Sequence, residues 1–343
     1  MEAPARKPTN KWLLIVGIAA GLICCGVVGV VGLAGGFTAL QTYSRAATIT
    51  AEPEFARSVA WSPDGRLIAG GYSRGRITVF DSSNGDIVWS KTLHRDRVFN
   101  LAWSPDSSKV VSASADTSLT VWDAQTGDAL MTLEDHTSGV ASVAWSPHGQ
   151  LILSGDDNDN VFVWDASTGR LVETLTGHHG NVASLAWSPD GSVFASGAGD
   201  SNVVIWDGQT MEGRLVLEGH SGWVNTVGWS PDGERLASGD DAGLVVVWDV
   251  LTGKKLKSLT DHTSAVSGVG WSPHGAFLAT CSHDRTLILW NADTLRRVRI
   301  LQSDSDFWQL AWSPDGTELV TAMGDNSLII WNVVKGEPLR VLH

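Results

Sequence analysis

Cysteine is scarce in this sequence: the 343-residue chain contains only three. Cys24 and Cys25 are neighbours within an apolar stretch, and Cys281 stands alone in the rest of the chain. A disulfide framework needs pairs of separated cysteines, so the region around Cys281 cannot be held together by internal disulfides. Its stability must come from packing and hydrogen bonds. The three cysteines do not indicate whether the protein resides in an oxidising or a reducing compartment.

Positive charge is also in short supply, because 24 Lys and Arg stand against 37 Asp and Glu, for a net charge of −13. An acidic surface repels the phosphate backbone of DNA and RNA. We therefore expect no nucleic-acid partner.

One segment has no charge at all, since no charged residue lies between Lys11 and Arg45. A helix needs about 20 apolar residues to cross the ~30 Å hydrocarbon core of a bilayer. The sequence therefore predicts a short basic tail over residues 1–11, a transmembrane helix over 12–36 and a polar tether over 37–52. The positive charges of the tail predict a cytoplasmic N-terminus and an extracytoplasmic position for the remainder of the chain.

Two further interpretations of this segment stay open. A cleaved signal peptide would have an apolar core of about 7–15 residues, which is shorter than the one found here. Small residues also recur every four positions, a spacing that lets two membrane helices approach closely. Self-association would then run through Gly17, Gly21, Cys25 and Gly29.

The remainder of the chain is dominated by a repeated phrase. AWSPDG occurs at residues 60–65, and the same phrase or a close variant follows six more times. Its tryptophans are 42 residues apart, except for a last step of 41: Trp61, Trp103, Trp145, Trp187, Trp229, Trp271 and Trp312. A period of about 40–45 residues is typical of propeller blades with four strands each.

The repeat over residues 182–217 shows how one unit is built. VASLAW predicts a strand, SPDG a tight turn with a glycine free to take positive φ, and VFAS a second strand. VVIW is apolar on successive residues, which predicts a third strand buried on both faces, and RLVL predicts a fourth. Such small sheets can bury their apolar faces by stacking, and seven of them can close into a ring.

Trp-Asp pairs end the third strands of four repeats, at residues 122–123, 164–165, 206–207 and 248–249, and a histidine precedes most repeats. With these motifs and this period, the chain from about residue 46 onward resembles the WD-repeat (WD40) β-propeller family, and we place the propeller itself at residues 53–343. The resemblance implies an all-β fold: a seven-bladed WD40 β-propeller of four-stranded antiparallel blades, preceded by the single transmembrane α-helix.

The resemblance also implies a hydrogen-bonded set of His, Ser or Thr, Asp and Trp within each blade, here called a tetrad. Complete structural tetrads occur in blades 2, 4 and 6: His94, Ser112, Asp116 and Trp122; His178, Ser196, Asp200 and Trp206; His262, Thr280, Asp284 and Trp290. At the Asp position, blade 3 has Asn158 and blade 5 has Ala242; blade 7 has Ser303 in place of His, and blade 1 lacks the set. We expect these four blades to depend more on packing alone.

Three patterns resemble catalytic or metal sites but lack the context that such sites need. GYSRG at residues 71–75 fits G-x-S-x-G, yet a strand rather than a helix is predicted to follow it. The His, Ser and Asp of the blades recur with a Trp at a fixed offset, which indicates structural networks rather than one active site. GDDNDN at residues 155–160 lacks the glycine and distal glutamate of an EF-hand. We therefore expect no catalytic residue, no metal and no cofactor.

In the family's fold, the SPDG turns and Trp-Asp loops share one face of the ring, here called the SPDG-turn face. The His loops and second turns share the other, the family's top face, here called the His-loop face. The first face is monotonous, as in DAQTG, DASTG and DVLTG, whereas the His loops differ between repeats. Side chains that vary at matching positions of the loops can determine binding specificity.

Aromatic and arginine residues, which anchor protein interfaces most often, gather on the His-loop face of blades 7, 1 and 2, and Trp223 adds one in blade 5. Four aspartates make the opposite rim of this face acidic: Asp156, Asp157, Asp240 and Asp241. The predicted contact residues are Arg57, Tyr72, Arg74, Arg76, Arg95, Arg97, Phe99, Trp223, Phe307 and Trp308.

The sequence thus predicts a membrane-anchored, non-catalytic scaffold that binds a protein or peptide partner through the His-loop face. Two rival functions stay open. One is a sensor that signals through association of its transmembrane helices, and the other is an enzyme with an active site at the mouth of the central channel.

Overall fold

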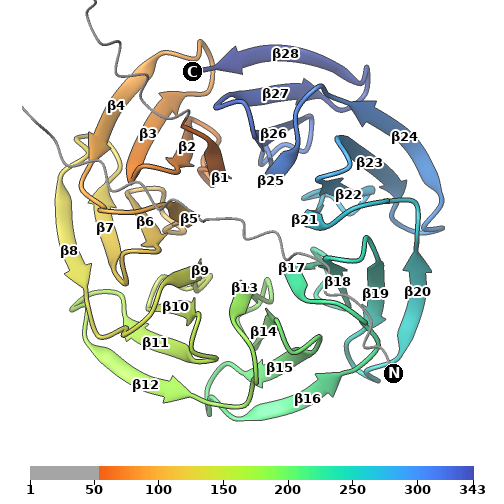
Figure 1. Cartoon of the computed structure of the whole chain (residues 1–343), viewed down its shortest axis with the longest axis horizontal. Helices are drawn as coiled ribbons and strands as arrows, with labels where there is room; N and C mark the ends of the chain where they lie inside the picture. Colours follow the sequence, from red (N-terminus) through yellow and green to blue (C-terminus); the bar gives the residue numbers. More distant parts are fainter. Residues whose placement is uncertain (1–53) are drawn as a thin grey trace, which may run out of the picture. The chain divides into compact units, whose positions relative to one another are not determined.

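The computed structural model describes residues 54–343, which form a ring of seven four-stranded sheets (Figure 1). Each sheet consists of four consecutive antiparallel strands, ordered from the ring centre outward. The prediction of an all-β, seven-bladed propeller is confirmed. The predicted tail, transmembrane helix and tether, with the small residues at positions 17–29, lie outside the described residues. Within residues 54–343, no helix combines the length and apolar character that a membrane crossing requires.

Strands at equivalent places in the blades have nearly equal lengths. The inner strands are β1 (Ala56–Trp61), β5 (Val98–Trp103), β9 (Val140–Trp145), β13 (Val182–Trp187), β17 (Val224–Trp229), β21 (Val266–Trp271) and β25 (Phe307–Trp312). The second strands are β2 (Leu67–Tyr72), β6 (Lys109–Ser114), β10 (Leu151–Asp156), β14 (Val193–Ala198), β18 (Arg235–Asp240), β22 (Phe277–Ser282) and β26 (Glu318–Met323). The third strands are β3 (Arg76–Asp81), β7 (Leu119–Asp123), β11 (Val161–Asp165), β15 (Val203–Asp207), β19 (Val245–Asp249), β23 (Thr286–Asn291) and β27 (Leu328–Asn332). The outer strands are β4 (Ile87–Thr92), β8 (Ala129–Leu133), β12 (Leu171–Leu175), β16 (Gly213–Leu217), β20 (Lys255–Leu259), β24 (Arg297–Gln302) and β28 (Glu337–Leu342).

The repeated SPDG phrase is a self-contained turn between the inner and second strands. In blade 1, the Ser62 hydroxyl donates to Asp64 Oδ1 at 2.7 Å and accepts the Leu67 N–H at 2.9 Å. Gly65 has a φ of +77°, a region that glycine enters without steric cost. Blade 2 has Ser107 at the glycine position with a φ of +60°, and its Oγ accepts the Asp64 N–H of blade 1 at 3.0 Å.

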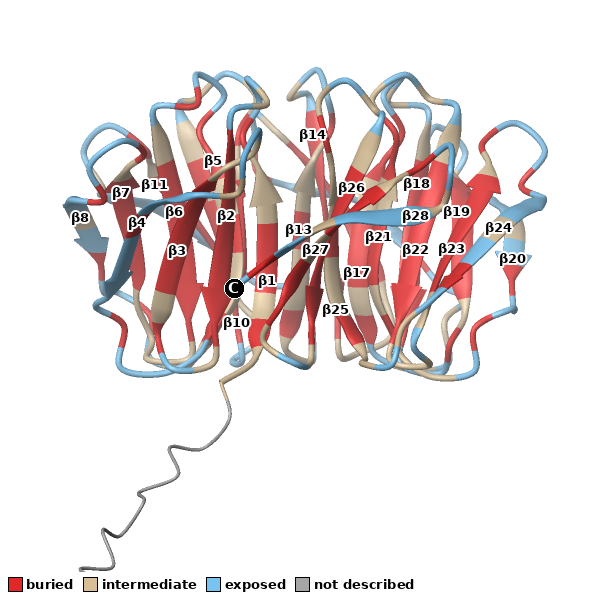
Figure 2. Cartoon of the chain, turned by 90° about the horizontal axis from the view of Figure 1, so that it is seen from above, coloured by how far each residue is buried: buried red, intermediate tan, exposed pale blue. Residues whose placement is uncertain are grey.

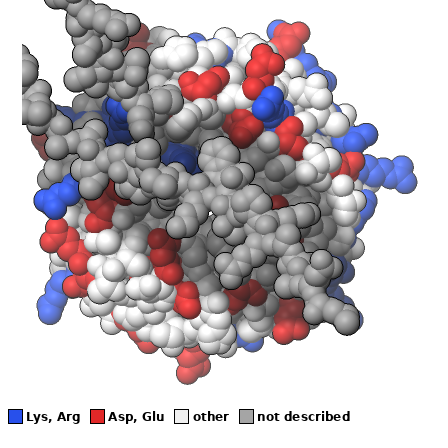
Figure 3. Space-filling model, viewed as in Figure 1, with Lys and Arg blue, Asp and Glu red and all other residues white. Residues whose placement is uncertain are grey.

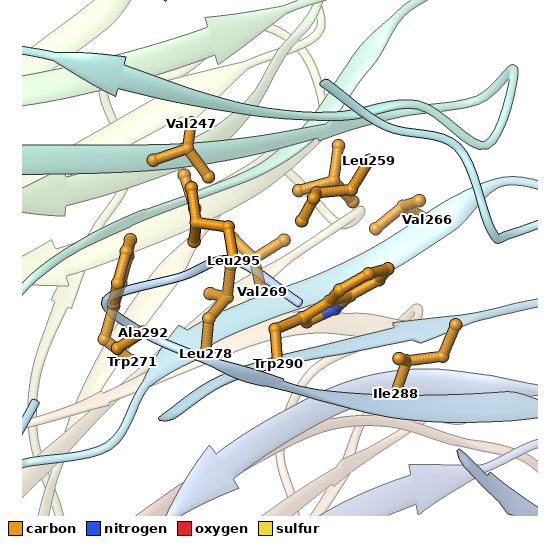
Figure 4. Close-up of a cluster of buried hydrophobic side chains, with 12 residues drawn as sticks. Val247, Leu259, Val266, Val269, Trp271, Leu278, Ile288, Trp290, Ala292 and Leu295 are labelled. Atoms are coloured by element: carbon orange, nitrogen blue, oxygen red, sulfur yellow. The ribbon is translucent and has the colours of Figure 1, made fainter. Parts of the chain in front are cut away.

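Sheet stacking explains which residues are buried. The third strands have an almost continuous run of buried residues, whereas the outer strands expose most of theirs (Figure 2). Apolar side chains of neighbouring blades interlock in the gaps between the sheets. Figure 4 shows one such cluster, in which Val247 and Leu259 of blade 5 meet Val269, Leu278 and Trp290 of blade 6. Each blade is therefore sandwiched by its neighbours.

The ring closes where blade 7 meets blade 1. Ile68 and Phe80 of blade 1 share a buried cluster with Val320 and Leu328 of blade 7. The inner strands are joined by a hydrogen bond from the Val59 N–H to Gln309 Oε1 at 2.7 Å. The C-terminal segment forms β28, the outer strand of blade 7. Blades 7, 1 and 2 are thus consecutive neighbours around the axis.

The tetrads of blades 2, 4 and 6 form chains of hydrogen bonds. In blade 6, the Trp290 indole N–H donates to Thr280 Oγ1 at 3.0 Å, and Thr280 Oγ1 lies 2.8 Å from His262 Nε2. His262 Nδ1 is 3.0 Å from Asp284 Oδ2. Burial lowers the pKa of His262, more than the neighbouring carboxylate raises it, so the imidazole is neutral near pH 7. Blades 2 and 4 repeat these contacts at similar distances.

Blades 3 and 5 correct the expectation that they depend on packing alone. Their carboxylate comes from a residue two positions earlier, at the end of the second strand. In blade 5, Asp240 Oδ2 lies 2.9 Å from His220 Nδ1, and Ser238 Oγ joins His220 Nε2 to the Trp248 indole N–H. In blade 3, Asp156 takes the same place beside His136, at 3.1 Å. Five blades therefore have a complete tetrad.

Blade 1 has a different network in place of a tetrad. Arg76 lies with its guanidinium carbon 3.8 Å from the centroid of the buried Tyr72 ring. Its Nη2 donates to Glu54 Oε2 at 2.8 Å and its Nη1 to Thr78 Oγ1 at 2.9 Å. In this blade, the ion pair of Arg76 and Glu54, with Arg76 stacked on Tyr72, stands in place of the tetrad.

Replacing Asp240 with alanine is expected to lower the free energy of unfolding by about 2 kcal/mol or more, because His220 then loses its buried partner. The matched control is Asp241→Ala, since Asp241 is adjacent but exposed. Urea unfolding followed by tryptophan fluorescence measures both variants. Equal stability of the two would show that the carboxylate of blade 5 contributes nothing.

Candidate functional site

The ring centre contains a cavity of about 380 Å³ built from equivalent positions of all seven blades. Strand residues alternate between faces, so the first residue of each inner strand is buried between blades and the second faces the axis. The second positions lining the cavity are Arg57, Phe99, Ala141, Ala183, Asn225, Ser267 and Trp308. Because each of these residues lies near the start of its strand, the cavity opens toward the His-loop face.

The cavity is lopsided. Blades 7, 1 and 2 contribute the large side chains Trp308, Arg57 and Phe99, while blades 3 and 4 contribute only Ala141 and Ala183 at the same position. One side of the cavity is therefore lined by large side chains, one of them charged, and the opposite side by small apolar ones. The sevenfold repeat of the backbone thus positions a site that has no sevenfold symmetry.

Three side chains from consecutive blades pack together at the cavity wall: His283 of blade 6, Trp308 of blade 7 and Arg57 of blade 1. We call these three side chains the Arg57 platform. The Arg57 guanidinium carbon lies 3.9 Å from the centroid of the Trp308 ring. The His283 ring meets the same indole edge-on, with centroids 4.4 Å apart and an interplanar angle of 63°. Trp308 is therefore held between an imidazole from blade 6 and a guanidinium from blade 1.

Hydrogen bonding is incomplete on this platform. Arg57 Nε, Trp308 Nε1 and His283 Nε2 are buried and have no partner, and they are three of the seven such atoms in residues 54–343. An unpaired buried polar group typically costs about 1–3 kcal/mol. Three such costs therefore meet at one place on the cavity wall.

Four other polar side chains around the cavity bind the backbone of a neighbouring blade. Gln309 Oε1 accepts the Val59 N–H, and the Ser267 hydroxyl donates to the Phe307 carbonyl at 2.6 Å. Ser184 and Thr226 likewise accept backbone N–H groups of the next blade, each at 3.1 Å. These side chains join inner strands together, whereas the Arg57 platform keeps polar atoms without a hydrogen-bond partner.

Electrostatics set this platform apart from its surroundings. Burial lowers the pKa of Arg57, and the nearby Arg97 guanidinium lowers it further. Burial also lowers the pKa of His283, opposed by Asp306 and Asp284 and assisted by Arg57, so this imidazole is neutral near pH 7. On the face shown in Figure 3, acidic side chains are spread over the described part, and most basic ones lie toward the rim.

Seven of the ten predicted contact residues fall into two groups in the structure. Arg57, Phe99 and Trp308 lie together in the cavity wall. The others that reach the surface are Arg95 and Arg97 in the β4–β5 loop, Arg74 in the β2–β3 turn, and Trp223, which is 60% exposed in the β16–β17 loop. The contact role of these residues stays a prediction.

Two predicted contacts are wrong as surface residues, because Tyr72 and Phe307 are fully buried. Phe307 is the first residue of its inner strand, a position that points between blades, and Tyr72 packs in the interface between blades 7 and 1. Arg76, a further predicted contact residue, forms an ion pair with Glu54.

The predicted acidic rim is also only half present. Asp156 and Asp240 are buried in their tetrads, whereas Asp157 and Asp241 are exposed, and Asp241 lines the cavity.

His283 is the member of the Arg57 platform that the sequence analysis missed. It precedes the tetrad carboxylate Asp284 in the β22–β23 turn, where blade 5 has Asp241 and blade 4 has Gly199. Comparing these second turns across the repeats would have marked it as different. Its contact with Trp308, however, joins a turn to the inner strand of the next blade and cannot be read from spacing.

The patterns that resemble active sites have structural roles in the described residues. Ser73 of the GYSRG segment accepts the Phe55 N–H through its Oγ at 2.9 Å. Asp156 of the GDDNDN segment binds His136. Across residues 54–343, no cluster of three or more His, Cys, Asp or Glu side chains has a metal-binding arrangement.

Arg57→Met is expected to leave the free energy of unfolding unchanged or to raise it by up to about 1–3 kcal/mol, because it removes a buried unpaired nitrogen. The arginine has no carboxylate partner to lose in the described chain, and methionine keeps much of its apolar contact. Arg76→Met is the matched variant, since it removes an arginine that is stacked in the same way but paired with Glu54. We expect it to cost about 1–3 kcal/mol by leaving that carboxylate unpaired. Thermal and urea unfolding measure both, and the reverse ranking would contradict the assignment of an unpaired arginine.

Comparisons with known proteins agree with this architecture. Residues 140–307 match a family model described as the WDR19 first beta-propeller, and residues 295–332 match the WD domain, G-beta repeat. Residues 43–106 match the WD40 domain of anaphase-promoting complex subunit 4, and residues 80–196 match eukaryotic translation initiation factor eIF2A. A search of curated proteins found no match. Together with the ring of seven four-stranded sheets, these matches show that the chain is a WD40-repeat seven-bladed β-propeller, a type of domain that is generally a protein-interaction scaffold and typically non-catalytic.

Proposed function

We propose that this propeller is a non-catalytic recognition module that binds a protein or peptide partner through its His-loop face. The observation that carries the proposal is the lopsided cavity at the ring centre, whose large wall combines Trp308, Arg57 and Phe99. Tryptophan and arginine dominate the energetics of protein interfaces, especially in central, partly desolvated positions. The exposed Arg97 and Trp223 extend the surface outward from the cavity mouth.

A rigid frame supports recognition rather than bond chemistry. The His, Ser and Asp side chains that could imitate a catalytic triad are used within the blades, as in blade 4, where Ser196 Oγ contacts both His178 Nε2 and the Trp206 indole. A binding surface built on such a frame is preorganised, so little conformational entropy is lost when a partner docks.

Selection of random peptides displayed on phage against the full chain tests this proposal. Peptides that bind should lose about tenfold or more in affinity to the double variant Arg97→Glu with Trp308→Ala, because both residues belong to the proposed surface. The matched control is Lys254→Glu with Leu251→Ala on the SPDG-turn face, where Leu251 is 95% exposed.

Melting temperatures of both double variants show whether the fold is retained. Peptides that bind the first double variant normally but not the control would place the binding surface on the SPDG-turn face and overturn the proposal.

We also propose that residues 12–36 anchor the chain in a membrane, with the N-terminus cytoplasmic and the propeller extracytoplasmic. The support is the uncharged apolar segment between Lys11 and Arg45, which is long enough for one helix to cross.

Extraction of membranes with alkaline carbonate should leave the full chain in the pellet, whereas Ile23→Asp with Val28→Asp should release it, because each central charge costs about 2.5–3.5 kcal/mol. Thr42→Asp in the predicted tether serves as control and should stay in the pellet. Protease added to intact cells checks orientation, and a protected propeller would reverse the proposed topology.

A further inference from the structure

We propose that the central cavity binds a carboxylate group of the partner, and that the terminal nitrogens of Arg57 receive it. The inference rests on the proposed recognition role of the His-loop face and names the chemistry that this face selects. The ligand group is a peptide carboxylate, supplied by an Asp or Glu side chain or by a chain terminus.

The first step of the argument is an unpaired positive charge. Arg76 is paired with Glu54, Arg285 with Asp306 and Arg297 with Asp261. Arg57 forms neither an ion pair nor a hydrogen bond with any described residue, although part of its side chain is buried. A cation held in a partly desolvated wall without a counter-charge favours an anionic ligand.

The second step is the direction of hydrogen bonding. A guanidinium can only donate, and so can an indole N–H. Arg57 Nε and Trp308 Nε1 are both buried donors without an acceptor, so acceptors are what these two stacked side chains lack. A carboxylate is acceptor-only and its two oxygens match the fork of an arginine, which makes it the complementary group.

The third step is positioning. Stacking on Trp308 fixes the plane of the Arg57 guanidinium, and the edge-on His283 ring supports the indole from the other blade. Trp308 and His283 are therefore positioning residues, while Arg57 makes the contact with the ligand. An arginine oriented in advance loses less entropy when its ligand arrives.

The fourth step is space and selectivity. A cavity of about 380 Å³ with Ala141 and Ala183 on the far wall has room for one acidic side chain and the apolar part of its neighbour. Asp241 lines the same cavity, and Asp306 lies close enough to His283 to influence its pKa. These carboxylates disfavour a doubly charged phosphate, so the site selects a single negative charge.

Titration of the full chain with three N-acetylated tripeptides tests the proposal: acetyl-Gly-Glu-Gly-amide, acetyl-Gly-Gln-Gly-amide and acetyl-Gly-Gly-Gly with a free C-terminal carboxylate. The nitrogen-15 resonances of the Arg57 Nε–H and the Trp308 indole N–H report binding. Arg57→Met and Trp308→Phe assign them by loss of the corresponding signal. The Glu peptide should shift both resonances saturably, and the matched Gln peptide should shift neither.

Variants then separate charge from structure. Arg57→Met should weaken the Glu peptide about tenfold or more, read from the Trp308 resonance, because the charge-assisted contact is lost. Arg57→Lys keeps the charge without the planar fork and should lie between. Arg66→Gln, an exposed arginine on the SPDG-turn face, is the control and should bind as the parent does. Unchanged resonances of the remaining tryptophans show that each variant is folded.

The Glu peptide and the free-terminus peptide distinguish the two sources of carboxylate. Equal shifts with Glu and Gln, no saturable shift up to about 50 mM, or full binding by Arg57→Met would each overturn the proposal, since even weak ligands reach millimolar affinity. Tighter binding of acetyl-Gly-phosphoserine-Gly-amide than of the Glu peptide would overturn it in favour of a phosphate site. Selected peptides that need the His-loop face but no carboxylate would leave the recognition module standing and remove this inference alone.

Discussion

Stacking of neighbouring sheets is the interaction on which the rest of this protein depends. The third strand of blade 4, Val203–Asp207, is buried along its whole length, so a blade alone in water would expose apolar surface on both sides. Burying both sides requires a neighbour on each, and only a closed ring gives every blade two neighbours. The ring in turn fixes the inner strands around one axis, and that is why seven residues from seven blades can line a single cavity.

The fold could be predicted from the sequence because its determinants are local and repeated. The SPDG turn contains its own hydroxyl, carboxylate and glycine. The third strand is apolar at successive residues, and this pattern predicts that both of its faces are buried. The tetrads of blades 3 and 5 show where such reasoning ends. Counting along the repeat expects the tetrad Asp at positions 158 and 242, which hold Asn158 and Ala242. A histidine, however, needs only a carboxylate oxygen within reach of its Nδ1. Asp156 and Asp240 reach it from the end of the second strand.

The candidate site was predictable in part, and the limit has a physical cause. Arg57, Phe99 and Trp308 stood out because a repeat makes any departure visible. Phe307 was misjudged because alternation along a strand, and not proximity in sequence to Trp308, decides which side chain reaches the axis. His283 was missed because it meets Trp308 across a blade boundary, and contacts of this kind follow from the closure of the ring rather than from a motif.

Hydrogen bonding differs between the tetrads, where it is satisfied, and the Arg57 platform, where three of the seven unpaired buried side-chain atoms of residues 54–343 lie. In five blades, indole, hydroxyl, imidazole and carboxylate meet one another's needs, as in the chain from Trp248 to Asp240. At the axis, Ala141 and Ala183 show that a small apolar residue fits the same strand position where Arg57 and Trp308 leave buried nitrogens unpaired. Each unpaired group costs about 1–3 kcal/mol, so these buried nitrogens oppose stability. Within the described residues, the Arg57 platform is where several such atoms meet, and the carboxylate proposed above would supply the acceptor that Arg57 lacks.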